Sequence, residues 1–150
     1  MNIKNFVFGL IASVFFSAAA NAGSADHSAP AVQGYDVVSY HTEKRPAKGN
    51  GHYVATHNGA TYLFSSEENL AEFKKTPEKY VPAYNGYCAF GVSVSKKFIG
   101  DPEVWRIVDG KLYLNLDANI QAEWLKDVPG KIKEADKNWK RIANKSPESL

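Results

Sequence analysis

Residues 52–73 read HYVATHNGATYLFSSEENLAEF and predict a β-hairpin followed by a helix. The pair Asn58-Gly59 readily adopts the positive φ angles of a two-residue hairpin turn, and aromatic and β-branched residues flank it on both sides. The helix is expected to begin after Ser65, whose hydroxyl can accept a free backbone amide while Glu68 reaches back to complete a capping box. This stretch therefore predicts a ββα unit.

The same pattern returns at residues 104–125, which read VWRIVDGKLYLNLDANIQAEWL. Asp109-Gly110 supplies the second turn pair, and Asp117 is the expected helix cap. The two stretches align without a gap at a separation of 110 − 59 = 51 positions. The identical pairs include Gly59 with Gly110, Tyr62 with Tyr113, Leu63 with Leu114 and Glu72 with Glu123. Duplication explains these matches, and so does chance similarity between two units of one architecture.

The predicted fold class is α+β, with two hairpin-plus-helix halves whose strands join into one small antiparallel sheet and whose helices pack on one face. A C-terminal helix is expected from Pro129 to Ile142, because apolar residues recur there at three- and four-residue spacing. We expect residues 34–143 to form one domain, residues 23–33 a flexible arm and residues 144–150 a frayed tail.

The first 22 residues have the pattern of a signal peptide. Lys4 gives a positive start, an apolar run follows from Phe6 to Ala20, and Ala20-Asn21-Ala22 has the small-x-small form that signal peptidase accepts. Cleavage there leaves 150 − 22 = 128 residues in the periplasm or outside the cell, with no stable membrane span. An uncleaved anchor that holds a globular domain outside the cytoplasm is the alternative interpretation.

The composition favours a packed domain and disfavours a nucleic-acid partner. The chain holds 18 basic and 16 acidic residues, and along the sequence the basic residues are scattered among acids instead of forming a stripe that could neutralise phosphates. Three tryptophans, eight tyrosines and eight phenylalanines predict a core rich in aromatic area.

Cys88 is the only cysteine and lies in the connection between the two halves. An unpaired thiol in an oxidising compartment has two explanations. It is a functional group, as a ligand or a reactive thiol, or it is a small residue buried in the core. A thiolate with imidazole suits copper or zinc, but the spacing is not that of a zinc finger. The sequence shows no Cys-x-x-Cys pair, no glycine-rich phosphate-binding loop and no recognisable pattern of a Ser-His-Asp catalytic triad. An enzyme is therefore the less favoured class.

Several motifs occur in a characteristic order along the chain. They are Gly34-Tyr35-Asp36, Asn58-Gly59-Ala60-Thr61-Tyr62, Pro77-Glu78-Lys79-Tyr80, Gly86-Tyr87-Cys88-Ala89 and Asp109-Gly110-Lys111-Leu112-Tyr113. Together they resemble the exported YHS-domain proteins of bacteria over nearly the whole chain after the signal peptide.

The resemblance implies a small domain whose shorter relatives accompany copper-transporting ATPases and some metal-dependent hydroxylases. It also implies importance for Cys88, because some long exported members carry selenocysteine at the matching position. The shorter relatives have a pair of cysteines where this chain has Ser65 and Asn69 or their neighbours, so a two-cysteine site is not expected here.

The leading hypothesis is a periplasmic copper-binding accessory protein in which Cys88 is the soft ligand and Asp36, Tyr35 or His41 completes the site. Its partners would be the metal ion and a metal transporter or another periplasmic protein. The alternatives are a one-cysteine thiol redox protein and an interaction module with Cys88 in its core. Asp36 is expected either to cap a short helical turn or to approach Cys88, if the two Gly-Tyr motifs meet across the fold.

Overall fold

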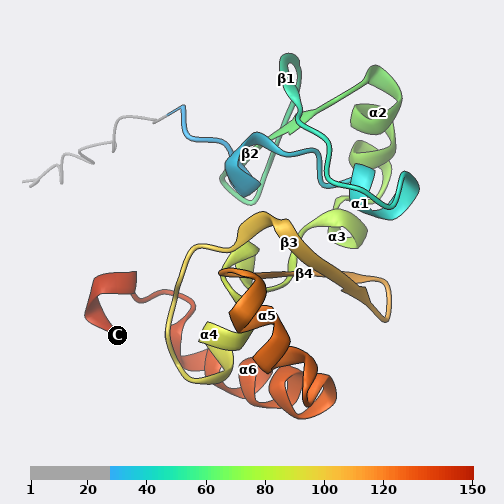
Figure 1. Ribbon diagram of the computed structural model, residues 1–150. Coiled ribbons are helices and arrows are strands. Elements are labelled where there is room, and N and C mark those ends of the chain that lie inside the picture. The colour runs from blue at the N-terminus through green and yellow to red at the C-terminus, as the bar shows by residue number, and fades with distance from the viewer. Residues whose placement is uncertain (1–27) are drawn as a thin grey trace, which may run out of the picture.

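The computed structural model of the protein describes residues 28–150 (Figure 1). The predicted signal peptide and residues 23–27 of the predicted arm lie outside the described residues. Within the part that is described, no helix is long and apolar enough to cross a membrane.

The chain forms two consecutive units of the same element order, and Figure 1 shows them as two neighbouring bodies. The first unit, residues 30–80, contains η1 (Ala31–Gly34), α1 (Ser39–Thr42), β1 (Asn50–His57), β2 (Ala60–Phe64), α2 (Glu67–Lys75) and α3 (Pro77–Tyr80). The second unit, residues 82–125, contains η2 (Ala83–Gly86), α4 (Ala89–Ser93), β3 (Asp101–Val108), β4 (Lys111–Asn115) and α5 (Ala118–Leu125). The long helix α6 (Val128–Ile142) and η3 (Pro147–Ser149) follow.

The predicted α+β class, the two hairpin-plus-helix units and the C-terminal helix are confirmed. The strands do not join into one sheet, however, because each hairpin forms its own two-stranded antiparallel sheet. In the second unit the chain before α4 lies beside β4, where Cys88 forms a parallel bridge with Leu114. That segment occupies the second edge of β4.

The starts of α5 and α6 follow the sequence expectation. Asp117 caps α5 by accepting the Ile120 amide at 2.9 Å, and Pro129 lies in the first turn of α6. For α2 the prediction of Ser65 was wrong, since the capping residue is Ser66, whose hydroxyl accepts the Asn69 amide at 3.1 Å. Ser65 is turned instead toward a buried carboxylate described below.

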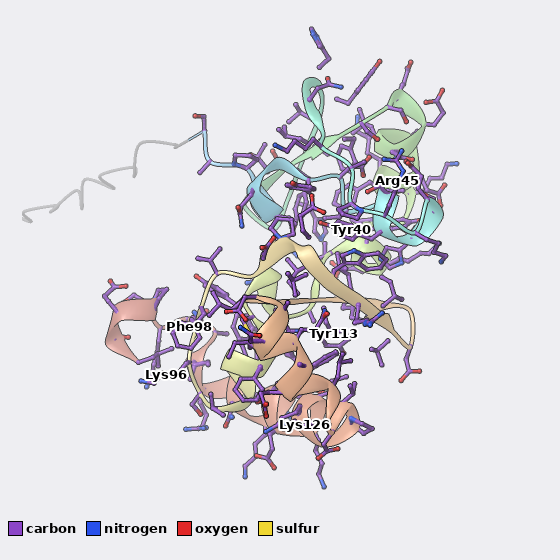
Figure 2. The ribbon with its side chains drawn as sticks, viewed as in Figure 1. Tyr40, Arg45, Lys96, Phe98, Tyr113 and Lys126 are labelled. Atoms are coloured by element: carbon purple, nitrogen blue, oxygen red, sulfur yellow. The ribbon has the colours of Figure 1, made fainter. Side chains whose placement is uncertain are left out.

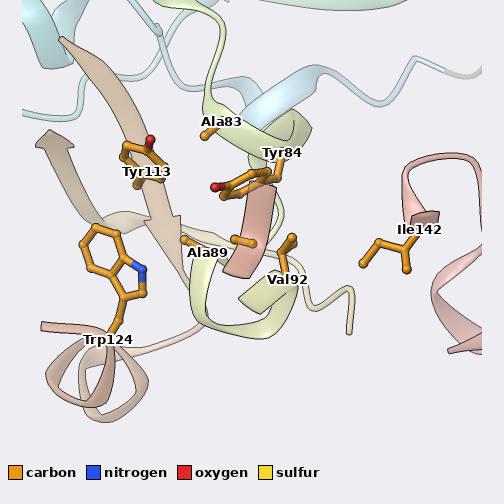
Figure 3. Close-up of a cluster of buried hydrophobic side chains, with 8 residues drawn as sticks. Ala83, Tyr84, Ala89, Val92, Tyr113, Trp124 and Ile142 are labelled. Atoms are coloured by element: carbon orange, nitrogen blue, oxygen red, sulfur yellow. The ribbon is translucent and has the colours of Figure 1, made fainter. Parts of the chain in front are cut away.

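Each unit has its own apolar core, and both cores contain several aromatic residues, as predicted. The core of the first unit consists of Val37, Val38, Tyr62, Phe64, Phe73 and Tyr80. The core of the second unit consists of Ala83, Tyr84, Ala89, Val92, Tyr113, Trp124, Ala135 and Ile142, the last two from α6 (Figure 3). A third cluster of Tyr40, Leu112 and Leu114 joins the units, and the Tyr40 hydroxyl there donates to the Pro102 carbonyl at 2.9 Å.

The two ends of the described chain contain short helices. η1 covers residues 31–34, most of which the sequence analysis assigned to the arm, and Gly34 within it is buried. η3 lies in the predicted tail, and the terminal Leu150 packs against the core of the second unit.

Candidate functional site

The repeat begins earlier in the chain than the hairpins, at two tight turns. Residues 30–36 read PAVQGYD and residues 82–88 read PAYNGYC, a separation of 86 − 34 = 52 positions. In each turn two consecutive residues other than glycine have φ between 50° and 54°, and a glycine with φ of 82° or 84° follows. Each turn is closed by the amide of its tyrosine, which donates to the carbonyl three residues earlier at 3.0 or 3.1 Å.

The backbone around the next residue repeats as well. The Asp36 amide donates to the Ala47 carbonyl at 2.8 Å, and the Cys88 amide donates to the Phe98 carbonyl at 2.8 Å. Paired left-handed residues are sterically costly and are not needed by a hairpin followed by a helix. Their recurrence therefore favours duplication over shared architecture. It also makes Asp36 and Cys88 equivalent positions in the two units.

Asp36 is fully buried, and its carboxylate accepts four hydrogen bonds. One oxygen accepts the Val38 amide at 2.8 Å, at the turn that leads into α1, which is the capping role expected from the sequence. The other accepts the Ser65 amide at 2.9 Å, the Ser65 hydroxyl at 2.7 Å and the Asn69 side-chain amide at 2.7 Å. Such a set of donors compensates for the loss of hydration of a buried charge. Asp36 thus ties the start of α1 to the start of α2.

Ser65 and Asn69 hold the positions at which the resemblance placed a cysteine pair in shorter relatives. Both side chains meet on Asp36, so these positions are close in space and are joined by hydrogen bonds. At the 51-residue separation, their counterparts in the second unit are Leu116 and Ile120, neither of which carries a polar side chain. The change from Asp36 to Cys88 is therefore accompanied by the loss of the side-chain donors around it.

Cys88 is 0% exposed and has few polar neighbours. Its sulfur accepts the Gly91 amide at 3.4 Å and lies 3.8 Å from Asn115 Oδ1, toward which the thiol donates. Burial raises the pKa of the thiol, and nearby backbone amides oppose that rise only in part. Asn115 Oδ1 also accepts the Phe90 amide at 3.4 Å, whereas Asn115 Nδ2 is buried and has no partner among residues 28–150.

Tyr35 joins the two units. Its hydroxyl donates to Glu103 Oε1 at 2.8 Å, and this hydrogen bond is the main reason why the pKa of Tyr35 is raised. Because Glu103 lies on β3, the contact connects the first Gly-Tyr turn to the hairpin of the second unit.

His41 lies at the end of α1, with its ring edge against Tyr80 at a centroid distance of 5.2 Å. Burial lowers the pKa of His41 to about 4, and Lys79, Lys44 and Lys111 act in the same direction. Its Nε2 atom is buried and has no hydrogen-bond partner in the described part of the chain. His41 is therefore a neutral ring surrounded by cations at neutral pH.

The two Gly-Tyr turns do meet, but the residues that follow them, Asp36 and Cys88, share no side-chain hydrogen-bonding partner among the described residues. A methyl group added to Gly86 would lie 3.9 Å from Val32 Cγ2, and the Gln33 side chain donates to the Gly100 carbonyl at 3.0 Å. The hydrogen-bonding partners of Asp36 belong to the first unit, and those of Cys88 belong to the second.

No metal centre is evident from the side chains that the structure describes. Among residues 28–150, no three His, Cys, Asp or Glu side chains are grouped closely enough to hold an ion. The thiol of Cys88 is the right type of donor for copper, but its neighbours are an amide oxygen and backbone amides. The roles of Cys88, Asp36, Tyr35 and His41 as metal ligands stay predictions.

Asn115 is the residue that sequence reasoning missed. It is fully buried in the second unit and aligns at 51 positions with Phe64, a core residue of the first. A polar residue at the place of a core aromatic is the signal that could have identified it. The match between PAVQGYD and PAYNGYC was the other missed signal, because it pairs Asp36 with Cys88.

Comparison with known protein families found a similarity that covers most of the first unit. The family model of the YHS domain matches residues 38–84, and over this segment the chain is similar to a YHS domain. No curated protein and no solved structure matched the chain. The YHS domain fits metal binding in general; the matched segment runs from the start of α1 into η2 and ends before Cys88.

Proposed function

We propose that the protein is a non-catalytic accessory protein that binds a metal ion outside the cytoplasm, and that the ion is copper. The YHS domain supports metal binding. Copper is the proposed ion because Cys88 is the only thiol of the chain, and thiolate is a donor that Cu(I) favours. The location rests on the signal-peptide pattern of residues 1–22, and the partner would be a metal transporter or another periplasmic protein.

The observation that carries the proposal is the position of Cys88. It takes the place that Asp36 has in the first unit. This place is buried and lies between the turn η2 and the strand β4. There it meets Asn115, whose Nδ2 atom has no partner in the described chain. Because no further soft donor lies beside it, Cys88 would be the single soft ligand from this chain. The molecule that delivers or receives the ion would supply the other ligand.

Burial sets a condition on this function. With the sulfur fully buried, the segment between Cys88 and Phe98 has to open before an ion can reach it. Opening of a small part of a fold costs less free energy than global unfolding, and it limits the rate of binding. The proposal therefore requires slow uptake of Cu(I) that accelerates under mildly destabilising conditions.

The test is a Cu(I) titration in competition with a chromogenic chelator, under reducing conditions. Wild type, Cys88→Ser and the control His52→Gln, which removes an exposed imidazole, are compared. We expect Cys88→Ser to weaken binding by about tenfold or more and His52→Gln to leave it unchanged. Equal affinity in wild type and Cys88→Ser would exclude Cys88 as the ligand, and no measurable binding in wild type would exclude the function.

The burial of Cys88 also favours a second candidate, an interaction module in which the thiol is only part of the core. This candidate predicts that Cys88→Ala lowers the free energy of unfolding while Cu(I) has no effect on the melting temperature of wild type. The thiol redox alternative required a lowered pKa at Cys88, whereas burial raises it, so we do not propose it.

A further inference from the structure

A loop of the second unit and the end of α6 together form one surface, which we call the cationic surface. Its exposed residues are Val94, Lys96, Phe98 and Ile99 from the loop, and Lys137, Arg141 and Lys145 from the C-terminal segment. The Lys97 ammonium joins the two segments by donating to the Ala143 and Lys145 carbonyls at 2.7 and 2.6 Å. Arg141 adds a hydrogen bond to the Ser95 hydroxyl at 3.2 Å.

The fold gathers charge that is scattered along the sequence. Residues 93–100 and 137–147 contain six Lys and Arg residues and no Asp or Glu. The rest of residues 28–150 contains 17 − 6 = 11 basic and 15 acidic residues. These two segments thus have a formal charge of +6, with five of the six basic side chains exposed and Lys97 buried, whereas the remainder of the described chain has a formal charge of 11 − 15 = −4. The surface is therefore complementary to an anionic partner.

Three large apolar side chains project from the same surface. Val94, Phe98 and Ile99 are 49%, 46% and 60% exposed. The repeat shows that the fold does not require Phe98 and Ile99, because their equivalents in the first unit are Ala47 and Lys48. Figure 2 shows Lys96 and Phe98 on the loop that runs beside the C-terminal segment.

The loop is held firmly although its apolar side chains are exposed. Lys97 is 7% exposed, and its ammonium lies over the rings of Tyr87 and Trp139 at 5.0 and 5.2 Å from their centroids. Phe98 lies close to Gly91, since a methyl group on that glycine would approach the ring to 2.9 Å. The apolar side chains are thus presented in a fixed position.

We infer that the cationic surface binds peripherally to a bilayer that contains anionic phospholipid. Lysine and arginine side chains near such a bilayer are attracted to its headgroups over about one Debye length, roughly 8–10 Å near physiological salt. Phe98, Ile99 and Val94 would enter the boundary between headgroups and acyl chains, which takes up projecting apolar side chains without a preformed groove. The phosphates of a nucleic acid offer no comparable place for three aliphatic or aromatic side chains.

The first test places a probe at the proposed contact. In the full chain, Phe98→Cys is labelled with an environment-sensitive fluorophore, and the native thiol is protected from labelling because Cys88 is fully buried. We expect a blue shift with vesicles of phosphatidylcholine and phosphatidylglycerol, none with phosphatidylcholine alone, and reversal by high salt. A label at Leu125→Cys, an exposed position on α5 outside the cationic surface, should not respond. An equal response at both positions, or no response at either, would overturn the inference.

The second test uses binding of full-length variants to the same vesicles by cosedimentation. Lys96→Glu with Lys145→Glu changes only exposed side chains, and Phe98→Ser with Ile99→Ser removes the apolar contacts. We expect each pair to reduce the binding to anionic vesicles by about tenfold or more, and the exposed control Val54→Ser to leave it unchanged. The apolar N-terminal residues are common to all variants and cannot cause a difference between them. Unchanged binding of both pairs, or a blue shift at residue 98 caused by self-association or an acidic protein without lipid, would refute the proposal.

Discussion

Removal of the negative charge of Asp36 should destabilise the protein although the side chain keeps its shape in Asp36→Asn. The carboxylate accepts four hydrogen bonds in a fully buried position. An asparagine offers one oxygen, so its amide nitrogen must face either the Val38 amide or the donors of Ser65 and Asn69. At least one donor then opposes another donor in the interior.

The expected loss of stability follows from the free energy that hydrogen bonds to a buried charge contribute. A hydrogen bond to a charged group contributes about 1.5–3 kcal/mol, and a buried donor left without an acceptor costs about 1–3 kcal/mol. We expect Asp36→Asn to lower the free energy of unfolding by about 2–3 kcal/mol. Asp36→Ala leaves all four donors without their acceptor, and we expect it to cost about 3–5 kcal/mol, because the losses are not additive.

Urea denaturation followed by tryptophan fluorescence measures both changes. Asp117→Asn is the matched control, because Asp117 is exposed, accepts the single Ile120 amide, and asparagine caps a helix about as well as aspartate. A stability of Asp36→Asn within about 0.5 kcal/mol of wild type would refute the reasoning, since surface substitutions have effects of that size. If Asp36→Asn lowers the stability as expected and leaves the Cu(I) affinity unchanged, Asp36 is a structural residue and not a ligand.

Three further predictions concern the thiol, the buried imidazole and the glycines at the start of the strands. Cys88 should react slowly with iodoacetamide at neutral pH in the folded protein and rapidly in urea, because it is fully buried and its pKa is raised; fast alkylation of the native state would contradict the packing. The pKa of His41 lies at about 4, below its ordinary value of 6.5, so the unfolded state takes up its proton first as the pH falls. The free energy of unfolding should therefore decline between about pH 6.5 and 4, as measured by denaturation across pH. The decline should be less steep in His41→Gln. Gly100→Ala should cost about 1–3 kcal/mol, since its methyl group would lie 2.6 Å from the Gly86 carbonyl oxygen, whereas Gly51→Ala, with open space around it, should be close to neutral.

The elements that could be predicted are those specified by neighbouring residues. Asn58-Gly59 and Asp109-Gly110 form the two hairpin turns, with positive φ at all four positions, as their sequences indicated. The capping residue of α2 could not be chosen locally, because Ser65 and Ser66 are adjacent and both suit the role. The choice is made by Asp36, which lies 29 residues before Ser65 and binds its hydroxyl.

The turn η1 was unpredictable for a different reason. Val32 and Gln33 adopt φ of 50° and 51°, a region that neither side chain favours, so no propensity indicates it. The number of sheets could not be predicted from local patterns either, because it depends on contacts between segments that are distant in the sequence. One of these segments contains Cys88, which pairs with Leu114 of β4 and which the sequence pattern placed only in a connection.

The comparison of Asp36 with Cys88 indicates where the two units differ in function. In the first unit, a carboxylate and its four donors form a closed hydrogen-bonding set. In the second, the thiol stands among apolar counterparts of those donors, and Asn115 Nδ2 and Trp124 Nε1 are buried without partners among the described residues. A buried donor without an acceptor costs free energy, so a fold selected only for stability would replace Asn115 with an apolar residue such as its counterpart Phe64. Buried polar atoms without partners among the described residues thus occur in both units, at His41 Nε2 in the first and at Asn115 Nδ2 and Trp124 Nε1 in the second. Of these three side chains it is Asn115 that contacts the Cys88 thiol, and it lies outside the segment matched by the YHS domain.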